Sequence, residues 1–196
     1  MFRPSLDERK NYLADMATKV FAKGGYKSAS LQNIAKKAGI SKAGIYHYFN
    51  TKEEILYFII KRGHDRFLRV LRNGIEESQE QKLGPEEAFR KFIVSYASFI
   101  NHEKETRLIV LRDRHQLTGK YKKGLYKMER EIFDTLKREL KKIPGVEKKY
   151  DPNTISFLII AMSHWMGYWV KDGGLLSLES AIEESVDIIF HGILKK

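Results

Sequence analysis

The chain has 196 residues, enough for one large domain or two modest ones, and it contains no cysteine, which excludes disulfides and thiolate metal sites. It holds 36 lysines and arginines against 25 aspartates and glutamates, and the resulting net charge of +11 favours an anionic partner, with DNA the best candidate. The N-terminus lacks the apolar core of a signal peptide, and polar residues interrupt the longest apolar stretch, 155–170, so we expect a cytoplasmic protein that does not enter a membrane.

The first predicted helix begins at a capping box formed by Ser5 and Glu8. Gly24-Gly25 should end it, because glycine readily takes the left-handed conformation found after a helix. Its core face is expected to consist of Leu13, Met16, Ala17, Val20 and Phe21, which recur at helical spacing.

Residues 30–52 predict two short helices joined by a tight turn, followed by the start of a third helix. Ser30 and Ser41 are placed to cap the two short helices, and Gly39 is placed to end the first. Ile40, in the turn, is expected to plug the small core. The other predicted core positions are Leu31, Ile34, Ala35, Ala38, Ile45 and Phe49.

The outer surface of this segment suits nucleic acid. It is expected to present Lys42, Ala43, Gly44, Tyr46, His47 and Tyr48. Small residues let the backbone approach bases or phosphates, while tyrosine and lysine can donate to phosphate. Residues 1–52 hold 10 basic against 3 acidic side chains, whereas the rest of the chain holds 26 against 22. This pattern is typical of a helix-turn-helix that places its second helix in the DNA major groove.

The third helix is predicted to start at Thr51, which fits a capping box with Glu54. Lys52 then lies beside the free amides of the first turn, and both its charge and those amides attract a phosphate. Inward-facing residues continue along this helix at Ile55, Leu56, Ile59, Ile60, Phe67, Leu68 and Leu71. It is expected to link a DNA-binding head to the rest of the protein.

The remainder of the chain reads as helical, with no predicted strand. Breaks at Gly84-Pro85 and Pro144-Gly145 separate helices expected at 85–102, 104–116 and 119–142. Asp151-Pro152 starts a helix to about residue 171 that is apolar on most sides, so we expect it to be buried on most sides. Gly173-Gly174 predicts a turn, after which Ser177 caps a last helix. The apolar stripe of that helix is Ile182, Val186, Ile189, Phe190 and Ile193.

The first third of the chain resembles the N-terminal domain of the TetR/AcrR family of transcriptional regulators. The matching residues include Ile34-Ala35-x-x-Ala38-Gly39-Ile40-Ser41-Lys42-Ala43-Gly44-Ile45-Tyr46-x-Tyr48-Phe49 and Lys52-Glu53-Glu54-Ile55-Leu56. The end of the preceding helix, Phe21-Ala22-Lys23-Gly24-Gly25-Tyr26, matches as well. The resemblance implies an all-α protein with a three-helix DNA-binding domain at 1–50 and a larger ligand-binding and dimerisation domain at 51–196.

Members of that family are homodimers and are usually repressors released from a palindromic operator by a small ligand. The resemblance implies that Lys42, Ala43, Gly44 and Tyr46 face bases or the groove edge, joined by Gln32. It also implies that Ser30, Tyr48 and Lys52 hold phosphates. His47 is left with two alternatives, contact with DNA or packing against the following helix. The two C-terminal helices are implied to pair with those of a second subunit.

The effector site is expected among aromatic and basic residues of the larger domain: Tyr96, Phe99, Arg107, Leu111, Phe133, Trp165, Tyr168 and Trp169. The stretches 165–179 and 107–114 resemble members that sense fatty acyl-CoA, whose phosphates could pair with arginine. A neutral aromatic or cationic drug-like ligand is the alternative, and an ordinary aromatic core is a further one. We expect no cofactor and no metal.

Three other functions are alternatives. One is a nonspecific DNA-coating protein, which would show no footprint at a discrete palindrome. An enzyme is not expected, because the six histidines show no metal-ligand spacing and the sequence has no phosphate-cradling glycine loop or nucleophile elbow. A basic membrane-surface protein is a remote alternative. Against it, the last predicted helix carries Glu179, Glu183, Glu184 and Asp187, which anionic lipid would repel.

Overall fold

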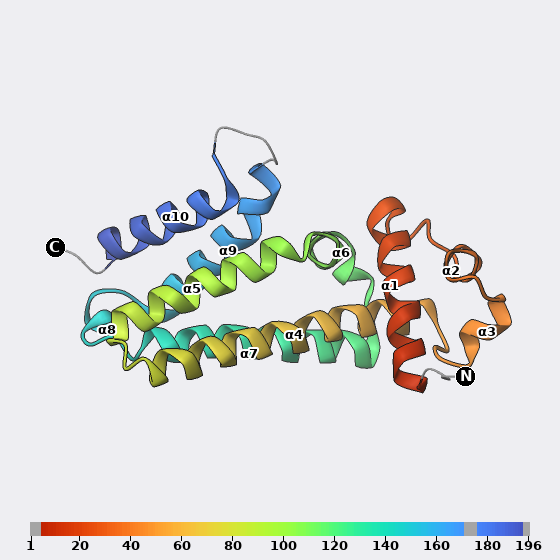
Figure 1. The fold of residues 1–196 in the computed structure, drawn as a ribbon, viewed down its shortest axis with the longest axis horizontal. Coiled ribbons are helices and arrows are strands. Elements are labelled where there is room, and N and C mark those ends of the chain that lie inside the picture. Colours follow the sequence, from red (N-terminus) through yellow and green to blue (C-terminus); the bar gives the residue numbers. More distant parts are fainter. Residues whose placement is uncertain (1–4, 171–175, 194–196) are drawn as a thin grey trace. The chain divides into compact units, whose positions relative to one another are not determined.

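The computed structural model describes residues 5–170 and 176–193, leaving aside the side chains of Lys149 and Ile193. The described chain is all-helical, as expected, and contains no strand (Figure 1). The predicted turn at Gly173-Gly174 lies outside these residues. The helices are α1 (Leu6–Gly24), α2 (Leu31–Ala38), α3 (Lys42–Tyr46), α4 (Lys52–Glu80), α5 (Pro85–His102), α6 (Lys104–Asp113), the 3₁₀-helix η1 (Arg114–Gln116), α7 (Gly119–Leu140), α8 (Val146–Lys149), α9 (Pro152–Trp169) and α10 (Leu178–Ile193).

The chain folds into two compact units. Unit 1 consists of residues 1–64 and 105–128, and unit 2 consists of residues 65–104 and 129–196, so α4 and α7 each contribute to both. These bounds differ from the predicted division at residue 50. The physical reason is that buried residues of α6 and α7, such as Ile109 and Leu125, belong to the same hydrophobic core as α1, α2 and α3.

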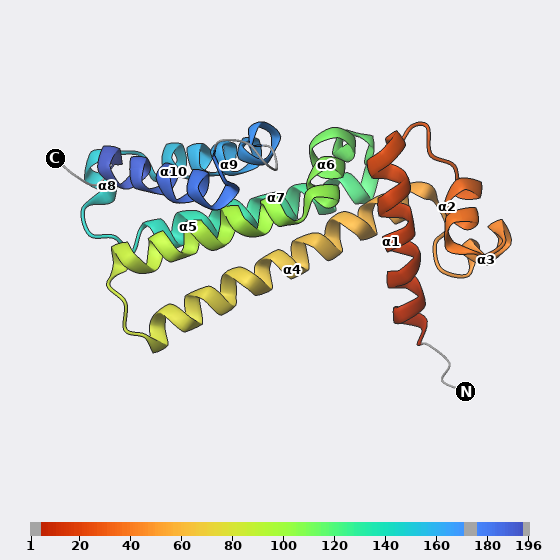
Figure 2. The same ribbon diagram turned by 45° about the horizontal axis from the view of Figure 1, so that its top comes forward.

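Unit 1 is built from the caps and core positions that the sequence predicts. Ser5 and Glu8 form the reciprocal capping box of α1, and Gly25, at φ +83°, follows its end. The buried side chains of α1 and α2 interlock around Phe21 and Ile34, which are 0% and 1% exposed. Figure 2 shows α1 running across the start of α4, with α2 and α3 forming the helix pair beyond it.

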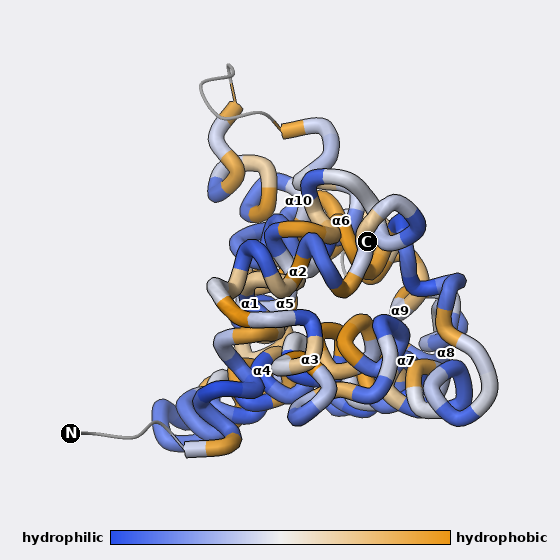
Figure 3. The backbone as a smooth tube through the Cα atoms, turned by 90° about the vertical axis from the view of Figure 1, so that its right-hand side faces the viewer, coloured by the Kyte–Doolittle hydropathy of each residue, from blue (hydrophilic) through white to orange (hydrophobic). Residues whose placement is uncertain are grey.

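Unit 2 is a helical bundle whose core lies between α5, α9, α10 and the parts of α4 and α7 that belong to it. Ile93 and Val186 are fully buried there. Arg90 of α5 donates to Glu183 of α10 at 2.8 Å and also pairs with Asp187, which fixes α10 against α5. The turns of α4 and α7 contain both hydrophilic and hydrophobic residues (Figure 3). No helix within the described residues is long and apolar enough to cross a membrane.

Two expectations for unit 2 need correction. The short helix α8 was not predicted, since four residues after Gly145 give too little periodicity to detect. The expectation that α9 is buried on most sides was wrong for the single chain, because one face of α9 carries large exposed apolar side chains. These are Phe157, Leu158, Trp165, Tyr168 and Trp169, between 54% and 73% exposed.

Candidate nucleic-acid interface

The candidate interface is the helix pair α2–α3, whose ends are fixed by side-chain caps. The Ser30 hydroxyl accepts a hydrogen bond from the Asn33 amide at 3.1 Å, and the Ser41 hydroxyl accepts one from the Gly44 amide at 3.0 Å. Gly39, at φ +70°, takes the left-handed conformation that ends α2 and turns the chain toward α3. These contacts confirm the predicted helix-turn-helix as a local structure.

Most of the predicted contact residues lie on the surface of this pair. Ser30, Gln32, Lys42, Ala43, Tyr46 and His47 are exposed. Gly44 and Tyr48 are half-buried, and Tyr48 packs against the core of unit 1. His47 is exposed, so its side chain is not buried against α4, and its contact with DNA stays a prediction.

Ile40 does not plug the core as expected, because it is 36% exposed. Its side chain lies over Gly44 instead: a Cβ added to Gly44 would stand 3.4 Å from Ile40 Cδ1. The core of the pair is closed instead by Ile45 and Phe49, both 0% exposed.

Lys52, the first residue of α4, is bound to the backbone that precedes α2. Its Nζ donates to the carbonyl oxygens of Ala29 at 2.6 Å and Tyr26 at 2.8 Å. It also stands 4.3 Å from the centroid of the Tyr26 ring. Burial lowers the pKa of the Lys52 ammonium, whereas burial and the Glu53 charge raise the pKa of the Tyr26 hydroxyl. Lys52 thus holds the turn from which α2 starts, a role that the sequence pattern did not suggest.

The cap at the start of α4 differs in one bond from the predicted capping box. The Thr51 hydroxyl accepts from the Glu54 amide at 3.0 Å, as expected. The Glu54 carboxylate, however, accepts from the Asn50 amide at 2.8 Å. The reciprocal bond therefore reaches one residue further back and ties the loop after α3 to α4.

An arginine of α6 braces the end of α1, the helix that leads into the helix-turn-helix. Arg112 Nη2 donates to the Phe21 carbonyl at 2.5 Å and to the Asp113 carboxylate at 2.9 Å. The Asp113 side chain is only 7% exposed, whereas that of Arg112 is 37% exposed. This brace explains part of the packing of α6 into unit 1.

The positive charge of the protein is concentrated in unit 1. Unit 1 holds 19 lysines and arginines against 7 aspartates and glutamates, a net charge of +12. Unit 2 holds 17 against 18, a net charge of −1. The two units differ more in net charge than residues 1–52 and the rest of the sequence do. The reason is that residues 105–128 add a net charge of +5 to the unit that carries α2 and α3. A basic unit of this kind is the electrostatic footprint of a nucleic-acid-binding protein.

The eight predicted effector residues do not form one cluster within either unit. Arg107 and Leu111 belong to unit 1, and the other six belong to unit 2. In unit 2, Tyr96 is fully buried and packs edge-to-face on Phe67, on which Phe99 is stacked. Phe133 is half-buried. Trp165, Tyr168 and Trp169 are exposed, and the Tyr168 ring contacts each of the two tryptophans edge-to-face.

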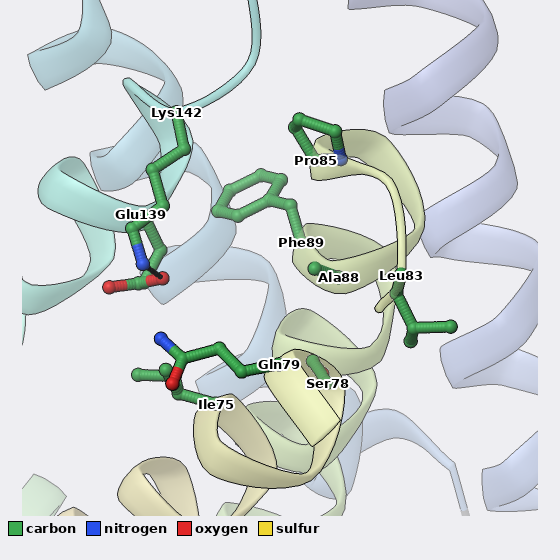
Figure 4. A pocket seen from close by; sticks show the side chains of 9 residues that line it. All are labelled: Ile75, Ser78, Gln79, Leu83, Pro85, Ala88, Phe89, Glu139 and Lys142. Atoms are coloured by element: carbon green, nitrogen blue, oxygen red, sulfur yellow. Dashed lines mark hydrogen bonds and ion pairs between the residues drawn. The ribbon is translucent and has the colours of Figure 1, made fainter. Parts of the chain in front are cut away.

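A cavity that the sequence did not predict lies in unit 2, at the ends of α4 and α7 and the start of α5 (Figure 4). Its volume is about 330 Å³, at the lower end of the range for small-ligand pockets. Apolar side chains including Ile75, Leu83 and Phe89 line it, and Glu139 and Lys142 form an ion pair at its edge.

Comparison with protein-family models gives two matches. The model for bacterial regulatory proteins of the tetR family matches residues 13–57, which contain α2, α3 and the start of α4. The model for a tetracyclin repressor-like C-terminal domain matches residues 82–193, more than half of the chain.

Individual relatives agree with these models. The HTH-type transcriptional activator FasR of Mycolicibacterium smegmatis is 23% identical over 192 residues, covering 95% of this chain and 84% of FasR. The HTH-type transcriptional repressor KstR2 of Mycobacterium tuberculosis is 24% identical over 203 residues, covering 97% and 96%. The crystal structure of AibR in complex with isovaleryl coenzyme A and operator DNA shares the fold, with a TM-score of 0.81 and 24% identity over 92% and 97% of the two chains. The chain therefore belongs to the tetR family of bacterial regulatory proteins, which are DNA-binding transcription regulators and not enzymes.

Proposed function

We propose that this regulator binds a palindromic operator as a homodimer in the cytoplasm and that a small effector controls its release. The observation that carries the proposal is the net charge of +12 in the unit that presents α2 and α3. The comparisons leave the direction of regulation open, since one relative is named as an activator and another as a repressor. We favour repression, the usual mode in the family.

In this proposal, Lys42, Ala43 and Tyr46 contact base edges or the groove edge, helped by Gln32, Gly44 and His47. Ser30 and Tyr48 contact phosphates, and Lys52 attracts a phosphate through its positive charge while its ammonium donates to the Tyr26 and Ala29 carbonyls. Phosphate contacts position the protein, while base contacts specify the sequence. The exposure of Lys42, Ala43 and Tyr46 on α3 supports their part in reading bases.

Lys52→Ala is expected to weaken binding to operator and non-operator DNA alike, by about tenfold, the value of one hydrogen bond to a charged group. Fluorescence anisotropy over a range of salt concentrations should show a slope of log K against log salt that is smaller by about 0.9, as for one lost phosphate contact. Lys148→Ala, an exposed lysine of unit 2, is the matched control. An unchanged slope together with a lower melting temperature would mean that Lys52 only holds the turn at Tyr26 and Ala29.

The proposed dimer uses α9 and α10. The exposed apolar residues of α9 recur at helical spacing on one face, and Ile188 of α10 is a further large apolar side chain, 71% exposed. Contiguous apolar surface of this kind marks an interaction site. Because unit 2 has a net charge of only −1, two copies can approach through it with little electrostatic repulsion. A twofold dimer also supplies the two half-site contacts that a palindrome requires.

For the effector we propose a fatty acyl-CoA, with an aromatic or cationic drug-like compound as the alternative. AibR, solved with isovaleryl coenzyme A, supports the first choice. Arg107, which is half-buried and whose pKa burial lowers, is a candidate partner for a CoA phosphate. Trp165 and Trp169 are exposed, so a ligand that changes their surroundings would change the tryptophan fluorescence of the protein.

Titration with acyl-CoA of increasing chain length is expected to change tryptophan fluorescence and to release the protein from its operator. Coenzyme A without an acyl chain is the control, because it keeps the phosphates and lacks the apolar part. No response in either signal at any chain length would reject the acyl-CoA proposal and leave DNA binding untouched.

A further inference from the structure

The first three turns of α7 carry four exposed lysines: Lys120, Lys122, Lys123 and Lys127, here called the α7 lysine face. No acidic residue lies between positions 119 and 128. On the opposite side of the same turns, Leu125 and Met128 are buried in the core of unit 1. The lysines therefore occupy the side of α7 that faces away from the core.

These lysines differ from the other charges of the same helix. The C-terminal half of α7 pairs its charges internally, with Lys137 3.7 Å and Arg130 3.9 Å from Asp134. Within residues 5–170 and 176–193, no ion pair is formed by any member of the α7 lysine face. Two of the four lie over aromatic rings: Lys120 is 5.0 Å from the ring centroid of Tyr121, and Lys122 is 5.7 Å from that of Tyr126.

Helix stability does not explain the position of the lysines. The helix dipole favours negative charge in the first turn, and α1, α4 and α5 each carry two acidic residues there. The first turn of α7 carries none, as is also the case in α2, α3 and α9. The Glu53 carboxylate of α4 reaches this end of α7, but it accepts hydrogen bonds from the amide and hydroxyl of Thr118, at 2.5 and 2.9 Å. Lys120 and Lys122 thus lie in the first turn of α7, where the helix dipole makes positive charge unfavourable for the helix.

We propose that the α7 lysine face binds the phosphate backbone of duplex DNA, as a sequence-independent contact separate from α2–α3. The face belongs to unit 1, the unit that carries the DNA-reading helices and a net charge of +12. Lys120, Lys123 and Lys127 are three and four residues apart, so they follow one another about every 5 Å along the helix axis. Duplex DNA carries a charge about every 1.7 Å along its axis, so such a row meets phosphates in any sequence. Lysine suits this contact because it binds phosphate as a point charge.

The test replaces all four lysines by glutamine and measures binding to a non-operator duplex over a range of salt concentrations. The charge-matched control replaces four exposed basic residues of unit 2 by glutamine in the same way: Arg69, Arg72, Lys82 and Lys148. Each lost phosphate contact lowers the slope of log K against log salt by about 0.9. We expect the slope of the α7 variant to fall by about 2 to 4 and its affinity to fall at least about tenfold, with much smaller changes in the control.

The variant should remain folded, with an unchanged or higher melting temperature, because it removes positive charge from a helix N-terminus. Its preference for operator over non-operator DNA should also persist, which separates this proposal from the roles assigned to α2–α3. Equal salt slopes in the variant and the control would overturn the proposal. A second result would also overturn it: a variant that no longer binds a poly-glutamate peptide but binds DNA as the wild type does. That result would identify an acidic protein as the partner of the α7 lysine face.

Discussion

Trp165→Glu is expected to convert the proposed dimer into monomers. Trp165 is 57% exposed on the apolar face of α9, and a twofold interface contains each of its residues twice. Loss of an aromatic anchor costs an interface about 2 to 4 kcal/mol, and the new carboxylates would have to be buried. The dimer dissociation constant should therefore rise at least about 100-fold, which sedimentation equilibrium measures directly.

Operator affinity should fall with the dimer, because two half-sites then have to be occupied by separate molecules. Val70→Glu is the matched control: Val70 is 38% exposed on α4 in unit 2, and the change adds the same charge. A Trp165→Glu protein that sediments as the wild type would show that the exposed face of α9 is not the interface.

Arg112→Ala is expected to destabilise unit 1. The substitution removes the hydrogen bond to the Phe21 carbonyl and leaves the Asp113 carboxylate, 7% exposed, without the arginine. Breaking a fully buried ion pair costs about 3 to 5 kcal/mol, and the partial exposure of Arg112 reduces that to about 2 kcal/mol. For a protein of this size the melting temperature should fall by about 5 °C, measured by circular dichroism.

The double variant Arg112→Ala/Asp113→Asn separates the two contributions of this brace. It removes the uncompensated carboxylate, so it should recover part of the lost stability while the bond to α1 stays absent. If the single and double variants melt at the same temperature, the Arg112–Asp113 pair is not what stabilises this part of unit 1.

Much of the fold could be predicted from local sequence signals. Caps, glycines and a proline placed both ends of α1 and α2 and the start of α5 correctly, since each depends on a few neighbouring residues. The membership of unit 1 could not be predicted in the same way. It depends on the burial of Ile109, Leu117 and Leu125 beside helices more than 50 residues earlier in the chain, which no local pattern encodes.

The candidate site shows the same limit. Exposure of Lys42, Ala43 and Tyr46 followed from helical periodicity. The contacts of Lys52 with two backbone carbonyls did not, because a lysine at a helix start predicts only a charge. The expected effector residues were chosen by type, and the structure places Tyr96 in the core and Trp169 on the surface.

The central claim is that a dimer of this chain reads a palindromic DNA sequence with α2 and α3. Selection of binding sites from a random duplex library, followed by footprinting of the winning sequence, tests it most directly. The account predicts two inverted half-sites about one helical turn apart, or a multiple of it, each protected by one protomer. The claim would be contradicted if the selected duplexes shared no sequence and the number of protein molecules bound per duplex rose with duplex length.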